Sequence, residues 1–396
     1  MKQVCLGDVA EVNPRVTAAL KALPDQDIAF LPMDAVGEDG SVRYQERRLA
    51  SSVLTGYTLF KKGDVLLAKI TPCMENGKAA YLDNLATEYG AGSTEFHVLR
   101  PGPDLDGRFL FYLIWNPAFR AKAEGRMTGS AGQKRVPADF LRDLSFKCPP
   151  LDEQRRIAAI LDKADAIRRK RQQALALADD FLRSAFLEMF GDPVTNPKGW
   201  PEVALEDIAT INSGLTKGRN LAGRDVVSLP YMRVANVQDG HLNLSDIKTI
   251  DLAADEVSRF LLHPGDILLT EGGDPDKLGR GAVWNGEIEN CVHQNHIFRV
   301  TCDRTKASPD FVSAQIGSQR GKKYFLRSAK QTTGIATINK TQLKAFPLLL
   351  PPLDVQRGYK TIVRKVEDWK QHLVTLTLQS EALFASLSQR AFRGEL

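Results

Sequence analysis

Short apolar runs, broken by glycine, proline and aspartate, fill two long regions of the chain, at 1–150 and 201–351. Four of these runs have the length and the flanking turn residues of buried strands, namely 65–70, 96–100, 267–270 and 296–300. The apolar stretch at 109–125 has the composition of a helix packed beside such strands. The pattern therefore predicts an α+β globular domain in each region.

Each globular region is followed by Pro-Pro-Leu-Asp and then by a long stretch with apolar residues at steps of three and four. Asp152 and Asp354 stand where a helix N-cap would bind free backbone N–H groups, and they predict helices at 151–191 and 352–396. These helices are much longer than the average globular helix of about 11–12 residues, and such long stripes are typical of coiled coils. The expected seam residues are Ile157, Ile160, Ile167, Phe181 and the polar exception Arg171 in the first helix, and Ile362, Val366, Trp369, Leu373, Leu376 and Leu383 in the second.

The chain also repeats itself over about half of its length, which indicates a duplicated module. Four ordered matches carry the repeat: LGDVAEVN at 6–13 with LEDIATIN at 205–212, KGDVLLA at 62–68 with PGDILLT at 264–270, GKAAY at 77–81 with GRGAV at 279–283, and PPLDEQR at 149–155 with PPLDVQR at 351–357. The last three pairs have the same offset of 202 residues. Each half is therefore expected to consist of one globular domain followed by one long helix.

Connectivity then favours one architecture. The first helix leads from the first domain to a turn-rich linker at 192–200, and the second helix leaves the second domain. The compact solution is an antiparallel coiled coil that separates two similar domains, related by a pseudo-two-fold axis. Such a pair of domains matches two half-sites on opposite strands of duplex DNA. Because the two halves differ at most positions, the expected DNA site is asymmetric and bipartite.

Composition narrows the class of protein further. The chain of 396 residues has no apolar run long enough to cross a membrane and no secretory signal at its start. Its five cysteines are scattered without a CxxC pair, which suits free thiols in a reducing cytoplasm. The net charge of +5 is compatible with a nucleic-acid partner but does not demonstrate one. We therefore expect a cytoplasmic protein.

Several longer motifs carry a family resemblance that extends over the whole chain. They are PPLDEQRRIAAILDKAD at 149–165, FLEMFGDPVTNPKGW at 186–200, YMRVANVQDG at 231–240, PPLDVQR at 351–357 and AFRGEL at 391–396. Together they resemble the specificity subunit of type I restriction-modification enzymes, usually called HsdS.

The resemblance implies a division of labour between subunits. Each globular region would be a target-recognition domain that reads one half-site. The two helices would be spacers that set the distance between half-sites and dock two modification subunits, so the seam residues are also candidates for subunit docking. Restriction subunits would then join for ATP-driven translocation and cleavage. In this scheme the present chain is not catalytic and binds no cofactor, while S-adenosylmethionine, ATP and magnesium belong to its partners.

The residues agree with a chain that lacks a catalytic site. There is no GxxxxGK[ST] phosphate loop. The run 116–119, Asn-Pro-Ala-Phe, resembles the Asn-Pro-Pro-Phe motif of amino-methyltransferases but lacks its second proline and a preceding glycine-rich motif. Cys291, His293, His296 and Cys302 suggest zinc at first sight, but strand alternation places His296 on the face opposite Cys291 and His293. We expect neither a catalytic residue nor a metal.

Candidate DNA-binding residues are polar and basic side chains in predicted loops, since phosphates are bound by lysine and arginine and bases by arginine, asparagine and glutamine. In the first half they are Lys69, Arg126, Gln133, Lys134 and Arg135; in the second they are Lys217, Arg219, Arg233, Asn236, Gln294, Asn295, Lys330 and Gln331.

Other functions remain open on the sequence. One is a free-standing nuclease or methyltransferase with an unrecognised site. Another is a coiled-coil adaptor that binds protein and not DNA, which would lack the salt-dependent affinity of a DNA-binding protein. A third is the specificity subunit of a system that only modifies DNA and has no restriction subunit.

Overall fold

The chain forms two compact units, each built from several β-sheets, short helices and a part of both long helices. The computed structural model describes residues 2–22, 24–130, 132–274, 278–332 and 335–396. Unit 1 comprises Met1–Gln173 and Val374–Leu396, and unit 2 comprises Ala174–Leu373. Unit 2 is therefore one continuous segment, whereas unit 1 is assembled from two segments that are distant in sequence.

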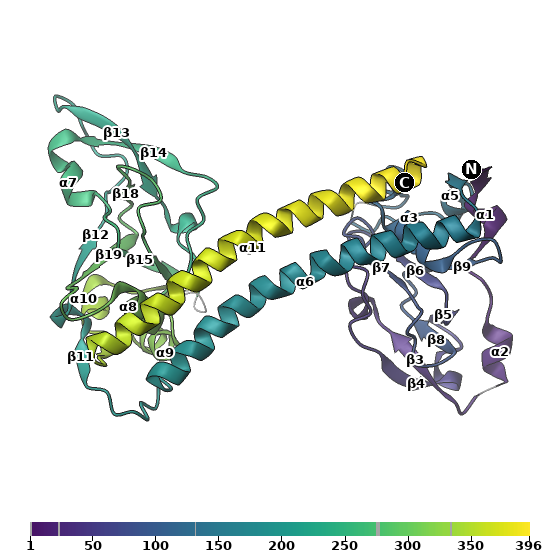
Figure 1. Cartoon of the computed structure of the whole chain (residues 1–396), viewed down its shortest axis with the longest axis horizontal. Helices are drawn as coiled ribbons and strands as arrows, with labels where there is room; N and C mark the ends of the chain where they lie inside the picture. The colour runs from purple at the N-terminus through teal and green to yellow at the C-terminus, as the bar shows by residue number, and fades with distance from the viewer. Residues whose placement is uncertain (1, 23, 131, 275–277, 333–334) are drawn as a thin grey trace. The chain divides into compact units, whose positions relative to one another are not determined.

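Unit 1 contains two four-stranded sheets (Figure 1). The first has the order β2 (Ala10–Val12), β9 (Phe96–Pro101), β6 (Val65–Ala68), β7 (Ala79–Tyr81), and all its pairs are antiparallel. The second has the order β4 (Glu46–Leu49), β3 (Asp27–Leu31), β8 (Tyr89–Gly92), β5 (Thr58–Lys61), with β3 and β8 parallel. A further pair joins β1 (Lys2–Cys5) to β10 (Ser145–Cys148). The helices are α1 (Leu6–Val9), α2 (Thr17–Lys21), α3 (Gly107–Trp115), α4 (Pro117–Glu124) and α5 (Ala138–Arg142), with short 3-10 turns at Met33–Ala35 and Ala50–Val53.

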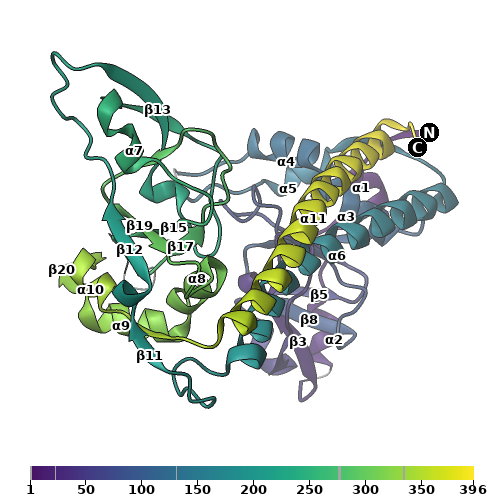
Figure 2. The same cartoon turned by 60° about the vertical axis from the view of Figure 1, so that its left-hand side comes forward.

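Unit 2 repeats this plan (Figure 2). Its four-stranded antiparallel sheet has the order β12 (Ala209–Ser213), β19 (Ile297–Cys302), β15 (Ile267–Thr270), β17 (Gly281–Val283). Unit 2 also has three smaller sheets. One has the order β14 (Lys248–Ala253), β13 (Val226–Met232), β18 (Val292–His293), and another has the order β16 (Gly272–Gly273), β21 (Ile335–Thr337), β20 (Lys330–Thr332). The third pairs β11 (Glu202–Ala204) with β22 (Pro347–Leu349). The helices are α7 (Val257–Phe260), α8 (Pro309–Ile316), α9 (Gln319–Ser328) and α10 (Lys340–Lys344), with 3-10 turns at Leu205–Asp207, Val234–Asn236 and Ala254–Glu256.

The equivalent sheets confirm the predicted repeat and the α+β class. Val65 of β6 pairs with Leu99 and Tyr81, and its counterpart Ile267 of β15 pairs with Val300 and Val283. All four residues of β6, and all four of β15, are buried, as expected for central strands in continuous apolar runs. The four strands predicted from apolar runs are all present.

The stretch at 109–125 is not one helix but two, and this corrects the prediction. Asn116 is extended, with ψ 134°, because the residue before a proline is disfavoured in the helical region. Its side-chain oxygen accepts a hydrogen bond from the backbone N–H of Ala118 at 2.7 Å, and its amide nitrogen donates to the hydroxyl of Ser388 at 2.9 Å. Asn116 is thus the N-cap of α4 and contacts the second long helix.

The two long helices are α6 (Leu151–Phe190) and α11 (Leu353–Arg393), and they run antiparallel inside each unit. In unit 1, Gln172 of α6 bonds to Glu381 of α11 at 3.2 Å. In unit 2, Lys370 of α11 contacts Asp179 of α6 at 2.5 Å. Within the described ranges, none of the helices combines enough length with enough apolar character to span a bilayer.

The seam between these helices differs from the predicted one. Ile157, Val366 and Leu373 are buried, and Ile160, Arg171, Ile362 and Leu376 are half-buried. Four other predicted residues are exposed: Ile167 (47%), Phe181 (55%), Trp369 (49%) and Leu383 (54%). On α11 the buried positions include Tyr359, Val363, Val366, Leu373, Thr377 and Ser380.

A shift of one residue along α11 accounts for two of the differences between the predicted and the observed buried positions. After Tyr359 and after Leu373 the next buried position of α11 follows four residues later and not three, so Val363 and Thr377 are buried where the prediction has Ile362 and Leu376. The sequence argument favours the larger apolar residue at each step, but small and large side chains are both buried along these helices. Ala164, Ala178, Thr377 and Ser380 are buried, and so are Tyr359, Val366 and Leu373. Size alone therefore does not determine which helix face is buried.

The repeated PPLD motifs start both long helices and lock them to their units through a glutamine. Gln154 is fully buried; its oxygen accepts from the backbone N–H of Asp106 at 2.8 Å, and its nitrogen donates to the carbonyls of Asp104 and Pro149, both at 2.9 Å. Gln356 is equally buried and bonds in the same way to the N–H of Ser308 and the carbonyl of Pro351, each at 2.8 Å. A single amide therefore joins the first turn of each long helix to the N-terminus of α3 or α8.

The repeated Gly-Asp motifs have an equally local cause. Asp64 is fully buried, accepts from the backbone N–H of Lys61 at 2.8 Å, and forms a two-bond ion pair with Arg100 at 2.7 and 2.8 Å. Asp266 caps the equivalent turn by accepting from the N–H of His263 at 2.8 Å. These aspartates fix the turn before each central strand.

Replacing the buried glutamine should weaken unit 1 strongly. Gln154→Ala leaves the N–H of Asp106 and two carbonyls without their partner, and we expect the opening free energy of α3 and the start of α6 to fall by about 2 kcal/mol. Hydrogen exchange measured by mass spectrometry on peptides from these helices reports that value. The matched control is Gln172→Ala on the same helix, which is exposed and should change it by less than about 0.5 kcal/mol. Equal effects of the two changes would contradict the assignment.

Candidate nucleic-acid interface

Each unit carries a hairpin at the same place beside its central strand. In unit 1, Thr128 and Arg135 exchange two backbone hydrogen bonds, at 3.0 and 2.8 Å, and Arg135 also pairs with Ile70. Gly129 and Gly132 have φ angles of +126° and +82°, which side chains disfavour and which the tight reversal requires. We call residues 128–130 and 132–135 the first hairpin.

In unit 2 the corresponding strands are β20 and β21, which we call the second hairpin. Lys330 pairs with Thr337, and Thr337 also pairs with Gly272 of β16. These pairs are the counterparts, 202 residues later, of Thr128 with Arg135 and Arg135 with Ile70. The two hairpins therefore have the same position and register on equivalent sheets.

The segment after each central strand joins the hairpin to the sheet by identical backbone bonds. The N–H of Lys69 donates to the carbonyl of Glu95 at 2.9 Å, and the carbonyl of Lys69 accepts from the N–H of Val136 at 2.9 Å. In unit 2 the N–H of Glu271 donates to the carbonyl of His296 at 3.0 Å, and its carbonyl accepts from Ile338 at 2.9 Å. Lys69 and Glu271 occupy equivalent places, and so do Glu95 and His296.

A buried histidine supports the first hairpin from below. His97 is 5% exposed; its Nε2 lies 2.8 Å from the carbonyl of Val136, and its Nδ1 lies 3.0 Å from the side-chain nitrogen of Asn13. These contacts assign the proton to Nε2, which donates to Val136. Burial lowers the pKa of His97 below its usual 6.5; the positive charges of Lys69 and Arg142 also lower it, whereas the Val136 bond and Glu95 act in the opposite direction.

The predicted residues of unit 1 gather around the first hairpin. Arg135 forms a two-bond ion pair with Glu95, at 2.9 Å in each bond, and this pair holds the pKa of Glu95 below its usual value. Lys69 is half-buried beside it. Arg126, Gln133 and Lys134 are exposed, and in the described ranges the charges of Arg126 and Lys134 have no ion-pair partner.

The predicted residues of unit 2 are more dispersed. Arg219 is paired with Glu256 at 2.8 Å, and Arg233 donates to the carboxylate and the carbonyl of Asp246, both at 2.7 Å. These bonds lower the pKa of Glu256 and of Asp246. Lys217 is exposed and has no ion-pair partner in the described part of the chain.

Other predicted residues lie on loops and strands of unit 2. Lys330 is exposed on β20, and the side chain of Gln331 lies outside the described residues. Gln294 and Asn295 are half-buried in the turn between β18 and β19. Their backbone N–H groups donate to the carbonyls of Met232 and Leu215, at 3.0 and 2.9 Å. This turn leads directly into His296.

Asn236 is not available to DNA, and this corrects the prediction. Its side chain is 3% exposed and accepts from the backbone N–H of Arg233 at 2.9 Å. Its amide nitrogen donates to the carbonyls of Asn243 and Asp246, at 2.8 and 3.1 Å. Asparagine three residues after the start of a short helical turn is a common capping arrangement, and that spacing was the signal for a structural role.

Sequence reasoning missed the residues around the second hairpin. A shallow depression of about 460 Å³ opens there. Its lining residues are Val234, Glu271, Gly272, Gly273, Asp274, His296 and Thr337. His296 and Glu271 form an ion-pair contact of 2.8 Å across it, when the histidine is protonated. None of these residues was a candidate for DNA binding, because neither the glycine pair nor a lone histidine is distinctive in sequence.

Three of the four residues that suggested zinc belong to the core of unit 2, whereas His296 is exposed. Cys291 and Cys302 are buried, and burial raises the pKa of each thiol to about 12. His293 is also buried, its Nδ1 lies 3.0 Å from the carbonyl of Phe260, and burial lowers its pKa to about 4. In the described ranges no three histidine, cysteine or acidic side chains are grouped closely enough to hold a metal.

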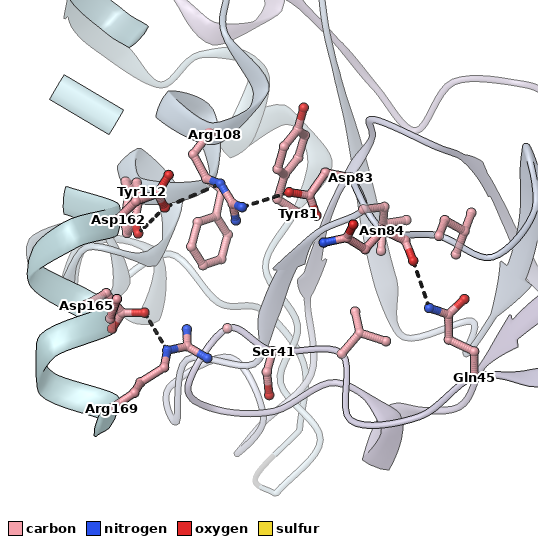
Figure 3. A pocket seen from close by; sticks show the side chains of 16 residues that line it. Ser41, Gln45, Tyr81, Asp83, Asn84, Arg108, Tyr112, Asp162, Asp165 and Arg169 are labelled. Carbon is pink, nitrogen blue, oxygen red and sulfur yellow. Dashed lines mark hydrogen bonds and ion pairs between the residues drawn. The ribbon is translucent and has the colours of Figure 1, made fainter. Parts of the chain in front are cut away.

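Another pocket, of about 340 Å³, lies in unit 1 where α6 meets the loop after β7 (Figure 3). Arg108 contacts Asp83 at 2.7 Å and Asp162 at 3.4 Å, and the hydroxyl of Tyr112 donates to Asp162 at 2.7 Å. Asp165 binds Arg169 at 2.6 Å. The charged groups here form ion pairs with one another, and the pair between Arg108 and Asp162 connects α6 to the rest of the domain.

Comparison with known proteins now identifies the family. The model of the type I restriction modification DNA specificity domain matches residues 1–177 and again 197–381. The chain therefore belongs to this family and contains two of its domains.

Individual relatives agree with this assignment. The EcoAI type I specificity subunit of Escherichia coli is 42% identical over 152 residues, which cover 38% of this chain and 25% of that protein. The StySPI specificity subunit of Salmonella potsdam is 26% identical, over 75% of this chain and 67% of the relative. The chain thus spans only about a quarter of the EcoAI relative. A solved chain from a study of complex assembly in the type I R-M system has the same fold, with a TM-score of 0.60 at 20% identity, covering 100% of this chain and 98% of the other.

The support from His97 makes the first hairpin sensitive to acid. Because the folded pKa of His97 lies below 6.5, the opened state binds a proton more readily, so stability is complete above pH 6.5 and is lost as the pH falls below it. We expect the hairpin amides of Thr128 and Arg135 to open more often on going from about pH 7 to about pH 5, as measured by hydrogen exchange corrected for intrinsic rates. His97→Gln keeps a donor for Val136 but does not titrate, and should abolish the trend. A trend that persists in this variant would exclude His97 as its cause.

Proposed function

We propose that this chain is the DNA specificity subunit of a type I restriction-modification complex and that each unit reads one part of an asymmetric, bipartite site. One observation carries the proposal. The same hairpin stands beside the same sheet in both units, with matching backbone bonds but different side chains. A shared scaffold with divergent side chains is what two readers of different sequences require.

The charges around the hairpins suit a phosphate backbone. Arg126 and Lys134 in unit 1, and Lys217 and Lys330 in unit 2, are exposed and have no ion-pair partner among the described residues. Such cations bind phosphates and release counterions, and this gives affinity without sequence preference. The arginines held by carboxylates keep a fixed orientation and retain unused donors, which suits them to reading base edges.

In this proposal the chain itself carries out no chemistry. The Asn-Pro-Ala-Phe run, its one likeness to a methyltransferase motif, has a structural role, since Asn116 caps α4 and bonds to Ser388. S-adenosylmethionine, ATP and magnesium would be bound by the modification and restriction subunits. The chain positions those subunits on DNA.

The long helices provide a surface for partners. In unit 2, Leu177 and Phe181 are one turn apart on α6 and are 64% and 55% exposed. In unit 1, Val374 and Leu378 are one turn apart on α11 and are 47% and 62% exposed. Adjacent exposed apolar side chains on a helix favour an interaction site. We propose that two modification subunits dock on these helices and that restriction subunits join them.

The methylation pattern of DNA tests the proposed function. The chain is expressed with its cognate modification subunit in a host without adenine methylation, and every methylated adenine is mapped by single-molecule sequencing. We expect a two-part motif with an unread spacer, methylated on both strands, that disappears when this chain is omitted.

Two results would redirect the proposal. A soluble complex that leaves the DNA unmethylated would contradict a role in specificity and favour a protein adaptor. Methylation that continues without this chain would place sequence recognition in the partner. Cleavage of unmethylated DNA on addition of the restriction subunit separates the full system from one that only modifies.

Removing the apolar surface should weaken assembly without unfolding the chain. Leu177→Ala with Phe181→Ala deletes exposed side chains on a helix, so the stability of unit 2 should change by less than about 1 kcal/mol. The affinity for the modification subunit, measured by analytical ultracentrifugation or interferometry, should fall at least about tenfold. Arg183→Ala, an exposed residue on the same helix, is the control. Unchanged affinity in the double variant would place the docking surface elsewhere.

A further inference from the structure

We infer that three equivalent positions beside each hairpin determine which bases each unit reads: Lys69, Glu95 and Arg135 in unit 1, and Glu271, His296 and Thr337 in unit 2. We call each set a reading triplet. The inference rests on the proposed function and adds to it the residues that set specificity.

The backbone shows that the two triplets are equivalent. Residue 69 or 271 donates its N–H to the carbonyl of residue 95 or 296, at 2.9 or 3.0 Å. The same residue accepts, at 2.9 Å in both units, from the residue that follows the hairpin strand, Val136 or Ile338. The third member, Arg135 or Thr337, pairs with both the opposite hairpin strand and the segment that follows the central strand.

The side chains at these three equivalent positions differ in charge between the two units. Unit 1 has a cation at the first position and a carboxylate at the second, whereas unit 2 has a carboxylate at the first and a histidine at the second. The third position changes from arginine to threonine. Equivalent places on one scaffold thus present different electrostatic patterns, although the backbone bonds around them are the same.

Stability does not require these side chains. The paired groups are partly open to solvent, with exposed fractions of 41% for Arg135, 25% for Glu95, 58% for His296 and 33% for Glu271. Ion pairs this exposed contribute little to folding. The first hairpin is held by backbone bonds and by His97 beneath it. The triplets are therefore free to differ between units, as residues that contact a variable ligand must be.

In unit 1 the geometry favours guanine. Arg135 uses Nε and Nη2 to bind Glu95 and one donor of Nη1 to bind the carbonyl of Gln133 at 3.1 Å. Two of its five N–H donors remain, one on each terminal nitrogen. A guanidinium held in this way presents a pair of donors, which matches the O6 and N7 acceptors of guanine in the major groove. Lys69 adds a positive charge beside the pair.

In unit 2 the triplet lines the shallow depression described above. His296 contacts Glu271 through Nδ1 at 2.8 Å, and its Nε2 has no hydrogen-bond partner among the described residues. The neighbouring threonine offers a hydroxyl that is both donor and acceptor, and a methyl group. This set lacks a rigid pair of donors and is therefore expected to read a different base pair from that read by Arg135.

The test is a set of methylation maps made with the full chain and its modification subunit. Arg135→Ala should relax one base pair in one half-site, with roughly a 10- to 100-fold loss of discrimination for guanine, and leave the other half-site and the spacer unchanged. Arg135→Lys keeps the charge but removes the planar pair of donors, and should relax the same base pair. The combined change Lys69→Glu, Glu95→His and Arg135→Thr should alter the preferred base in that half-site only.

The control has the same ion-pair geometry at another place in unit 1. Arg156 binds Glu153 through Nε and Nη2, at 2.8 and 2.7 Å, and is 50% exposed, so Arg156→Ala should leave the motif unchanged. Suppose that the chain without substitutions yields a bipartite motif and that both Arg135 variants yield that same motif. The inference is then overturned, while the proposed function stands. If the unmodified chain directs no methylation, the proposed function itself fails.

Discussion

A buried side-chain amide determines how each long helix is attached to its unit. Gln154 and Gln356 are completely excluded from solvent, and each one satisfies backbone groups from the helix start and from the loop before α3 or α8. An amide in such a place is favourable only when its donors and acceptor are all used. The direction in which each helix leaves its unit is thereby fixed. The packing of the first turns of α6 and α11 depends on these bonds.

Some residues are the same in both halves of the chain because they maintain the fold, whereas others differ between the halves on an equivalent backbone. The buried aspartates before the central strands, Asp64 and Asp266, recur in both halves because each closes the same turn. The surface around the hairpins differs between the halves, although the backbone bonds there are the same. The two units thus share one backbone frame at the hairpins and carry different side chains on it. This is the arrangement expected of a protein that recognises two different segments of one ligand.

The sequence was sufficient to predict the repeat, the α+β class, the central strands and the two long helices, because apolar periodicity and repeated motifs report burial directly. It was less informative about which helix face is buried. Trp369 and Leu383 fit an apolar stripe in the sequence, yet both are exposed, whereas the smaller and polar Thr377 is buried. Polar residues were harder still, since Asn236 and Arg233 look alike as DNA candidates and only the fold shows that one is a buried cap. The reading triplets depend on pairings between strands that are far apart in sequence.

The division of the chain has a consequence for the order of events on the ribosome. Unit 2 is one continuous segment, 174–373, whereas unit 1 needs residues 374–396, which are synthesised after all of unit 2. Phe109 packs against Phe392 with ring centroids 5.3 Å apart, Tyr112 packs against Phe384 at 6.2 Å, and Asn116 bonds to Ser388. These surfaces of unit 1 cannot receive their α11 partners until the whole of unit 2 has been translated. The completion of unit 1 thus waits for unit 2, and an aromatic face of unit 1 lacks its α11 partners throughout that interval.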